Sequence, residues 1–390
     1  MGILLRNLLA TLTLAVALGG CVTLTRTPFT ALDVAHASPP GFTDIRYSQD
    51  DPRLAAMLRR SMRANGQNEI VSLAISGGGA NGAYGAGLLY QWSKTGMRPQ
   101  FQLVTGVSTG ALTAPFAFLG SDWDERMRKA YFSPSLAKLL QGRGLAGILT
   151  PGFFKKAPLV DLVRSEVSDE LLAAIAAEHA KGRRLLVATT NLDTEEMVVW
   201  DMGAIATQGG PAARELFIQI MVASASVPGV FPPSLIEVET GGRRFSELHV
   251  DGQAEGAFFA IPQTLLLSRM VQREHARARI YIIINGQLDG LFQLTPHSTL
   301  SILARTLDTA NKASIRSMLI STEEFCQRSG CDLKVSDLPT TVVDDPLNFS
   351  AAHIAALFAA GSAAAEDRNG WSAGPVAPIA APPARSTSQH

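Results

Sequence analysis

Two glycine-rich segments carry the residues best suited to chemistry. Gly106–Gly110 reads Gly-Val-Ser-Thr-Gly, a pattern that can place Ser108 at the tip of a sharp turn between a strand and a helix. Earlier in the chain, Ser76–Gly82 reads Ser-Gly-Gly-Gly-Ala-Asn-Gly, and it can present backbone amides at the start of another helix, where anionic oxygen is favoured. A nucleophile and a separate anion-binding loop are two of the parts that acyl transfer requires.

Strands and helices in alternation are expected to position these two segments. A short apolar run, 101–105, leads into Ser108, and a helical pattern follows it. The glycine run likewise lies between a β-branched strand and a helix. Such alternation, with fully apolar strands, predicts an α/β fold whose mostly parallel sheet is covered on both faces. Further elements are expected as strands at 70–75, 184–190 and 279–284, a hairpin partner at 195–202, and helices at 54–62, 84–92 and 300–319.

The glycine run also fits a nucleotide-binding pattern. Gly77, Gly79 and Gly82 have the spacing of a dinucleotide fingerprint, which additionally requires an acidic residue about twenty positions later. No Asp or Glu occurs between Ile70 and Ser121, and no Gly-Lys-Ser/Thr follows the glycines. We therefore expect no nucleotide cofactor.

A serine hydroxyl needs a neighbouring base before it becomes a good nucleophile. Histidine is the commonest choice, and a Ser-Asp-His order would be satisfied by His275, His297 or His353, none of which has a distinguishing loop. Asp251 differs because it ends an apolar run and precedes a glycine. An Asp-Gly step at a strand end predicts a tight turn that brings this carboxylate to the same sheet edge as Ser108.

Composition limits the other functions. The 390 residues are 46% hydrophobic, which suffices for a large core, and Lys+Arg equals Asp+Glu at 34 each. This balance gives no field that would favour nucleic acid. Charged residues make up only 17%, which is compatible with a surface that meets apolar material.

The amino terminus predicts export and lipidation. One arginine precedes an apolar run, 8–18, that is too short to span a bilayer and suits a signal peptide. The run ends in Leu-Gly-Gly before Cys21, which resembles the lipobox of bacterial lipoproteins. An ordinary cleaved signal peptide is the alternative. We expect acyl chains on Cys21 to anchor the protein in a bacterial envelope. Val22 after the cysteine suggests the outer membrane, with the protein facing the periplasm.

Only two other cysteines occur, Cys326 and Cys331. In an exported chain their spacing predicts a small disulfide loop. Two thiols without a histidine cluster fall short of the four ligands that zinc normally takes, so we expect no metal.

Four segments are expected. Residues 1–20 form the signal peptide, and 21–68 form the lipid anchor and a tether rich in turn residues. Residues 69–350 form the catalytic domain. Residues 351–390 are expected to be a largely disordered tail, because their far end is rich in Ala, Pro and Ser.

Four motifs occur in an order that resembles a known family. The glycine run, the segment around Ser108, the block Ala223–Pro233 (Ala-Ser-Ala-Ser-Val-Pro-Gly-Val-Phe-Pro-Pro) and the Asp-Gly step at Asp251 together resemble the patatin-like phospholipases. The resemblance covers about residues 69–290. It implies a three-layer α/β/α patatin-like fold and a lipid acyl hydrolase without cofactor or metal.

The resemblance also implies roles for individual residues. Ser108 would be the nucleophile and Asp251 the general base, without histidine. The backbone amides of Gly78, Gly79 and Ala80 would stabilise the tetrahedral oxyanion. Two positions depart from the family pattern, because Asn81 stands where Arg or Lys is frequent and Gln253 stands where Gly or Ala is usual. The expected substrate is a lipid acyl ester, and the loss of a cation at Asn81 weakens the case for a phosphate headgroup.

Two other functions remain open at this point. One is a conventional Ser-His-Asp esterase that uses one of the three histidines above. The other is a catalytically idle lipoprotein that binds lipids or a protein partner. Beyond the substrate and the membrane, the sequence identifies no partner.

Overall fold

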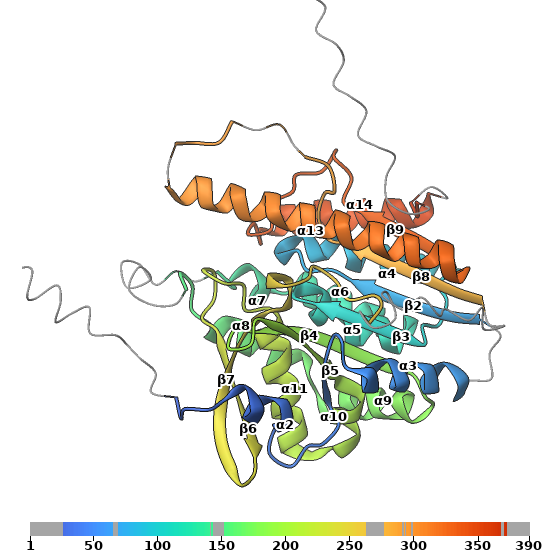
Figure 1. Cartoon of the computed structure of the whole chain (residues 1–390). Helices are drawn as coiled ribbons and strands as arrows, with labels where there is room; N and C mark the ends of the chain where they lie inside the picture. Colours follow the sequence, from blue (N-terminus) through green and yellow to red (C-terminus); the bar gives the residue numbers. More distant parts are fainter. Residues whose placement is uncertain are drawn as a thin grey trace, which may run out of the picture.

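The computed structural model describes residues 26–64, 69–140, 142, 152–262, 277–290, 292, 294–297, 299–367 and 370–372. The predicted signal peptide, the lipidation candidate Cys21 and His275 lie outside these residues. In the described part, a nine-stranded sheet runs in the order β1-β5-β4-β3-β2-β8-β9, and the hairpin β6–β7 joins it through β4 (Figure 1). The strands are β1 (Arg46–Ser48), β2 (Glu69–Ile75), β3 (Leu103–Val107), β4 (Arg184–Asn191), β5 (Glu196–Asp201), β6 (Ser234–Thr240), β7 (Arg243–Asp251), β8 (Arg277–Ile284) and β9 (Asp332–Asp337).

Four neighbouring pairs in the middle of the sheet are parallel, from β4 through β3, β2 and β8 to β9. The pairs β1–β5, β5–β4, β4–β7 and β6–β7 are antiparallel. The predicted hairpin partner at 195–202 is therefore confirmed as β5. The carboxyl ends of the parallel strands lie at one edge of the sheet, where the candidate residues follow β2 and β3.

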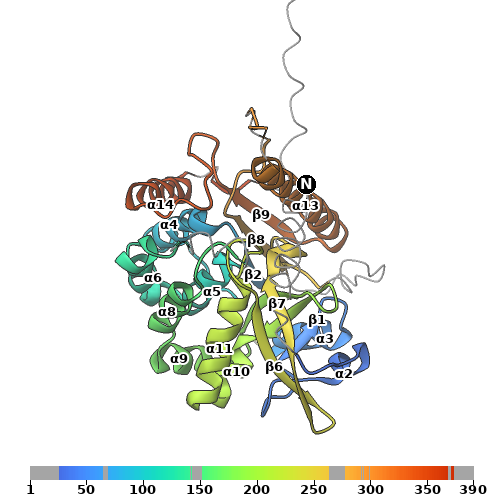
Figure 2. The ribbon, with the colours of Figure 1, turned by 90° about the vertical axis from the view of Figure 1, so that its left-hand side faces the viewer.

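Helices cover both faces of the sheet, as predicted. In Figure 2, α4, α5, α8 and α9 lie on one side of the strands, while α3 and α13 lie on the other. The helices are α2 (Ala31–His36), α3 (Pro52–Ala64), α4 (Gly82–Lys94), α5 (Thr109–Leu119), α6 (Asp124–Tyr131), α7 (Pro134–Ala137), α8 (Ala157–Glu166), α9 (Asp169–Ala180), α10 (Met202–Gln208), α11 (Gly210–Ser224), α13 (Thr299–Ser329) and α14 (Ala351–Glu366). Short 3₁₀ turns occur at Gly79–Asn81, Ser121–Trp123 and Gly252–Ala254.

The apolar strands supply a core on each face. Along β8, Ile283 packs into the largest core, whereas its neighbour Ile282 packs into a smaller core under α13. Along β4, Val187 belongs to the largest core and Leu186 to a third core near α3. Successive side chains of a strand point to opposite faces, so a strand buried on both faces must be apolar throughout. The α/β/α architecture predicted from these runs is confirmed.

Two predicted segment boundaries differ from the structure. Part of the expected tether is folded, because Arg46–Ser48 pair with β5 and add an edge strand to the sheet. The expected tail begins with the sixteen-residue helix α14, which packs on α4 and buries Ile354 and Leu357. Arg46–Ser48 and α14 gain their order from long-range contacts that local composition does not reveal. Residues 21–25 of the expected tether and 373–390 of the expected tail lie outside the described residues.

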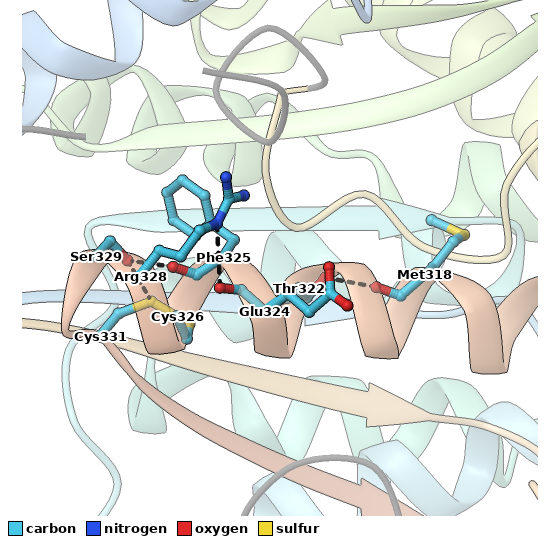
Figure 3. The surroundings of a disulfide bond; sticks show 8 residues. All are labelled: Met318, Thr322, Glu324, Phe325, Cys326, Arg328, Ser329 and Cys331. Carbon is cyan, nitrogen blue, oxygen red and sulfur yellow. Dashed lines mark hydrogen bonds between the residues drawn. A yellow bond between two sulfur atoms is a disulfide. The ribbon is translucent and has the colours of Figure 1, made fainter. Parts of the chain in front are cut away.

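Two features bear on the predicted export. In the described residues, no helix combines the length and apolar character needed to cross a bilayer. A disulfide joins Cys326 near the end of α13 to Cys331, and Figure 3 shows it closing the turn before β9. The Ser329 hydroxyl donates to the Phe325 carbonyl at 2.8 Å beside it. The disulfide therefore ties the last turn of α13 to the strand that follows.

Candidate active site

Ser108 lies at the sharp turn between β3 and α5. Its backbone adopts φ 56° and ψ −125°, a conformation that costs a non-glycine residue about 1–3 kcal/mol. The turn is crowded, since a Cβ at Gly106 would lie 2.7 Å from Cα of Ala111. Glycine is therefore required before the serine. The predicted strand–turn–helix context of Ser108 is present.

The side chain of Ser224, the last residue of α11, holds this turn in place through two hydrogen bonds. Its hydroxyl accepts from the backbone N–H of Ser108 at 3.0 Å and donates to the carbonyl of Ala188 on β4 at 2.7 Å. All three groups are buried. Ser224 thus satisfies an amide that would otherwise be unpaired in the core. The sequence showed this serine within the Ala-Ser-Ala-Ser block but gave it no role.

Asp251 ends β7 and lies next to Ser108. It pairs with Thr189 on β4, while Val107 on β3 pairs with Ala188 on the same strand. Val107, which precedes Ser108, and Asp251 therefore lie beside consecutive residues of β4, so Ser108 and Asp251 come close together. The backbone N–H of Asp251 donates to the carbonyl of Ser226 at 3.0 Å. The second serine of the Ala-Ser-Ala-Ser block thus holds the carboxylate's strand, just as the first holds the nucleophile's turn.

The carboxylate of Asp251 is buried and only half satisfied. Its Oδ1 accepts from the backbone N–H of Gln253 at 2.9 Å, whereas Oδ2 has no regular hydrogen bond to a described residue. Burial raises the pKa of Asp251 to about 7, and the Ser108 hydroxyl and the Gln253 amide offset this only in part. Ser108 is thus close enough to influence the carboxylate, but the pair is adjacent rather than joined by a regular hydrogen bond.

The glycine run passes beside Ser108. The amides of Gly78 and Gly79 donate to no other described residue, so both are available to an anion. Gly79 has φ 56°, and a Cβ there would overlap the carbonyl of Pro346. Ala80 differs, because its N–H donates to that same carbonyl at 2.8 Å. The prediction that Ala80 contributes to the oxyanion site was therefore wrong in this structure.

Thr109 supplies a donor that the sequence prediction missed. It is the first residue of α5, and its amide likewise pairs with no described residue. Its hydroxyl donates to the carbonyl of Gly79 at 2.9 Å, which holds the glycine run against the turn. The signal was available, because the residue after the nucleophile often completes an oxyanion site in serine hydrolases with this turn.

Asn81 is engaged within the protein. Its side-chain amide donates to Asp344 at 2.6 Å, and Lys312 of α13 lies 3.5 Å from the other oxygen of that carboxylate. The segment carrying Asp344 also carries Pro346, so it is fixed against the glycine run at two points. The polar side chain at position 81 therefore holds a neighbouring segment.

A narrow apolar cavity of about 90 Å³ opens beside the candidate dyad. Ser108 and Gly79 are among its lining residues, and apolar side chains of α5, α6, α8 and α11 form much of its walls. Leu347 and Phe349 close it from the segment after β9. An apolar channel next to a nucleophile fits a hydrocarbon chain better than a polar group.

None of the described histidines lines this cavity. His297 is exposed, and His353 lies on α14. His249 is fully buried between Thr189 at 2.9 Å and Glu247 at 3.1 Å, and burial lowers its pKa. Within the described ranges, no group of three or more His, Cys, Asp or Glu side chains is arranged to hold a metal ion.

The chain matches one family model. Residues 73–257 match the patatin-like phospholipase model. The match spans both glycine-rich segments, the Ala-Ser-Ala-Ser block and Asp251. Residues 73–257 therefore form a patatin-like phospholipase domain, as the resemblance predicted.

Other comparisons are more distant. VipD from Legionella pneumophila, a solved structure, is 13% identical with a TM-score of 0.37. The match covers 76% of this chain and 66% of that chain, so this protein spans slightly less than two thirds of VipD. No curated protein matches the sequence.

Proposed function

We propose that this protein hydrolyses acyl esters of lipids with Ser108 as nucleophile and Asp251 as general base. The observation that carries the proposal is the placement of these two residues on adjacent strand ends, beside free amides and an apolar cavity. The pKa of Asp251, raised by burial to about 7, suits a group that must accept and return a proton near neutral pH.

The reaction would proceed in two halves. Oγ of Ser108 attacks the ester carbonyl carbon while Asp251 takes the hydroxyl proton. The resulting oxyanion accepts hydrogen bonds from the amides of Gly78, Gly79 and Thr109. Collapse of this tetrahedral intermediate breaks the bond to the alcohol, which departs with the proton from Asp251. Ser108 then carries the acyl group as an ester. Water then attacks the acyl carbon while Asp251 takes its proton. Collapse breaks the bond to Oγ of Ser108, to which Asp251 returns the proton, and the free acid is released.

We also propose that the enzyme acts at a bacterial membrane. The apolar run before Cys21 and the Leu-Gly-Gly-Cys ending support lipidation of this cysteine and attachment to the outer membrane, facing the periplasm. An anchored enzyme meets lipid esters at high local concentration, which suits the apolar cavity beside Ser108. The side chain at position 81 is committed to Asp344, so a neutral ester is as suitable a substrate as a phospholipid.

The first prediction concerns Ser108→Ala and Asp251→Asn. Each should lower kcat/KM for short acyl esters at least ~1000-fold, because each removes one half of the proton-transfer pair. The measurement is hydrolysis of a panel of short esters, phospholipids and acylglycerols by the full chain, together with labelling by a fluorophosphonate probe. Ser108→Ala should abolish labelling.

The matched controls are His297→Ala and His353→Ala, together with His275→Ala. All three should keep wild-type rates. If Asp251→Asn stays active while one histidine variant loses turnover, the conventional Ser-His-Asp esterase is correct instead. If the folded wild-type protein reacts neither with any ester nor with the probe, the remaining hypothesis is a catalytically idle lipoprotein that binds lipids or a protein partner.

A further inference from the structure

The apolar cavity continues away from Ser108 along two helices. On α5, the lining residues Thr109, Leu112 and Phe116 recur at helical spacing. On α8, the lining side chains run from Leu159 to Glu166. Each set spans eight residues, or seven rises of about 1.5 Å, which corresponds to roughly 10 Å. The cavity is thus elongated, and its length is defined by the helices beside it.

The contacts between α8 and α11 show which end lies far from the nucleophile. The last residue of α11, Ser224, touches the amide of Ser108. Near the start of α11, Glu215 pairs with Arg164 of α8 at 3.0 Å. Nine residues of helix separate Glu215 from Ser224, or roughly 13 Å. The carboxyl end of α8, where Glu166 lies, is therefore at the opposite end of the cavity from Ser108.

The side chain of Glu166 lines this far end of the cavity, and its ion-pair partner Arg126 lies outside the lining. Glu166 is the one ionisable carboxylate among the described lining residues. Arg126 of α6 lies 3.7 Å from its side chain and donates to its backbone carbonyl at 3.0 Å. Arg126 also donates to Ser168 and lies over the ring of Trp123. An alkyl tail that reached this pair would remove water from both charges without replacing their hydrogen bonds, which is unfavourable.

We propose that the Arg126–Glu166 pair limits the acyl chain, so that the enzyme prefers chains of about eight to ten carbons. This proposal rests on the hydrolase function proposed above. A carbon–carbon bond of about 1.5 Å advances an extended chain by about 1.3 Å, so 10–13 Å accommodates roughly eight to ten carbons. The pair therefore sets the chain-length specificity, because it ends the apolar part of the cavity.

The test is a chain-length profile. The full wild-type chain is assayed with p-nitrophenyl esters from butanoyl to hexadecanoyl, below their aggregation limits. We expect kcat/KM to peak at octanoyl or decanoyl and to fall at least about tenfold by hexadecanoyl, the size of effect that poor accommodation of methylenes produces. In the double variant Arg126→Ala/Glu166→Ala, the hexadecanoyl-to-octanoyl ratio should rise at least about tenfold.

The matched control is Arg164→Ala/Glu215→Ala, which removes a neighbouring ion pair that does not line the cavity and should leave the profile unchanged. If the double variant does not fold, Leu162→Phe tests the same claim, because a larger side chain in the wall should move the peak to shorter chains. A flat wild-type profile, or a profile that none of these substitutions moves, overturns the proposal. Absence of butanoyl hydrolysis and of Ser108 labelling would instead overturn the proposed function.

Discussion

At the scale of single residues, Asp251 stands out because its environment determines its chemistry. A carboxylate in water is a weak base, with a pKa near 3.9. Here burial raises the pKa of Asp251 to about 7, while one backbone amide still orients Oδ1 and Oδ2 has no hydrogen-bond partner among the described residues. If Asp251 is the proposed base, this free oxygen can accept the serine proton without an imidazole. The neighbouring His249 is sequestered by Thr189 and Glu247 instead.

The second prediction follows from this pKa. The ionised form of Asp251 is required, and it is lost as pH falls through the pKa of about 7. We therefore expect kcat/KM to be constant above about pH 8 and to fall about tenfold per pH unit below about pH 6. The measurement is the pH profile of kcat/KM with a neutral ester, read from the released acid.

Lys156 provides the control for that profile. Burial lowers its pKa to about 8, and its ammonium group donates to the carbonyl of Pro233 at 3.0 Å. Because it titrates in a similar range, Lys156→Met should retain the acid limb if Asp251 is responsible. Full activity of the wild type at pH 5 would show that the base has an ordinary carboxylate pKa.

At the scale of elements, the end of α11 organises the site. Its two serines serve different strands: Ser224 holds the turn after β3, and the carbonyl of Ser226 holds the end of β7. One short block, Ser224 to Ser226, therefore sets the position of Ser108 relative to Asp251. The segment after β9 does the same for the glycine run, through Pro346 and Asp344.

The third prediction is that Ser224→Ala lowers kcat about tenfold or more with little change in KM. The substitution leaves the N–H of Ser108 buried and unpaired, which costs about 1–3 kcal/mol and loosens the turn that orients the nucleophile. The measurement is steady-state kinetics with an octanoyl ester, alongside thermal unfolding.

Thr207→Ala is the matched control, because its hydroxyl donates to the Gly203 carbonyl within α10 and does not contact the site. It should retain wild-type kcat. Equal kinetics of Ser224→Ala and the wild type would mean that the turn is held without this hydroxyl.

At the scale of the whole molecule, elements outside the family match complete the fold. The match ends at residue 257, yet β8 and β9 extend the sheet and α13 covers its second face. The helix α14 lies against α4. These two helices approach closely, since a Cβ at Gly361 would overlap the carbonyl of Tyr84. The helix that follows the glycine run is thus supported from the carboxyl-terminal part of the chain.

The fourth prediction tests that support. Gly361→Leu should lower the Tm by about 2–4 °C, because a side chain there forces α14 away from α4, and overpacking of this kind costs about 1–3 kcal/mol. Ala356→Leu, at an exposed position of the same helix, should leave the Tm within about 1 °C. Differential scanning calorimetry of both variants measures the difference. Equal melting temperatures would show that α14 adds nothing to the fold.

The sequence by itself determined the elements whose signals are local. Apolar strands ending in glycine turns predicted β2, β3 and the helices after them, and the ordered motifs indicated the family. They also indicated Ser108 and Asp251, because each lies directly at a strand end whose direction a parallel sheet fixes.

Tertiary structure alone decided which groups around the site hydrogen-bond to the protein and which stay free. The backbone N–H of Ala80 donates a hydrogen bond to the carbonyl of Pro346. The side-chain amide of Asn81 donates one to Asp344, a residue 263 positions away. The ordering of β1 and α14 and the pairing of Glu166 with Arg126 likewise depend on partners distant in sequence. A hydrogen-bond donor or a helical face has the same local sequence whether it meets solvent, substrate or protein, so only the packed chain shows which one it meets.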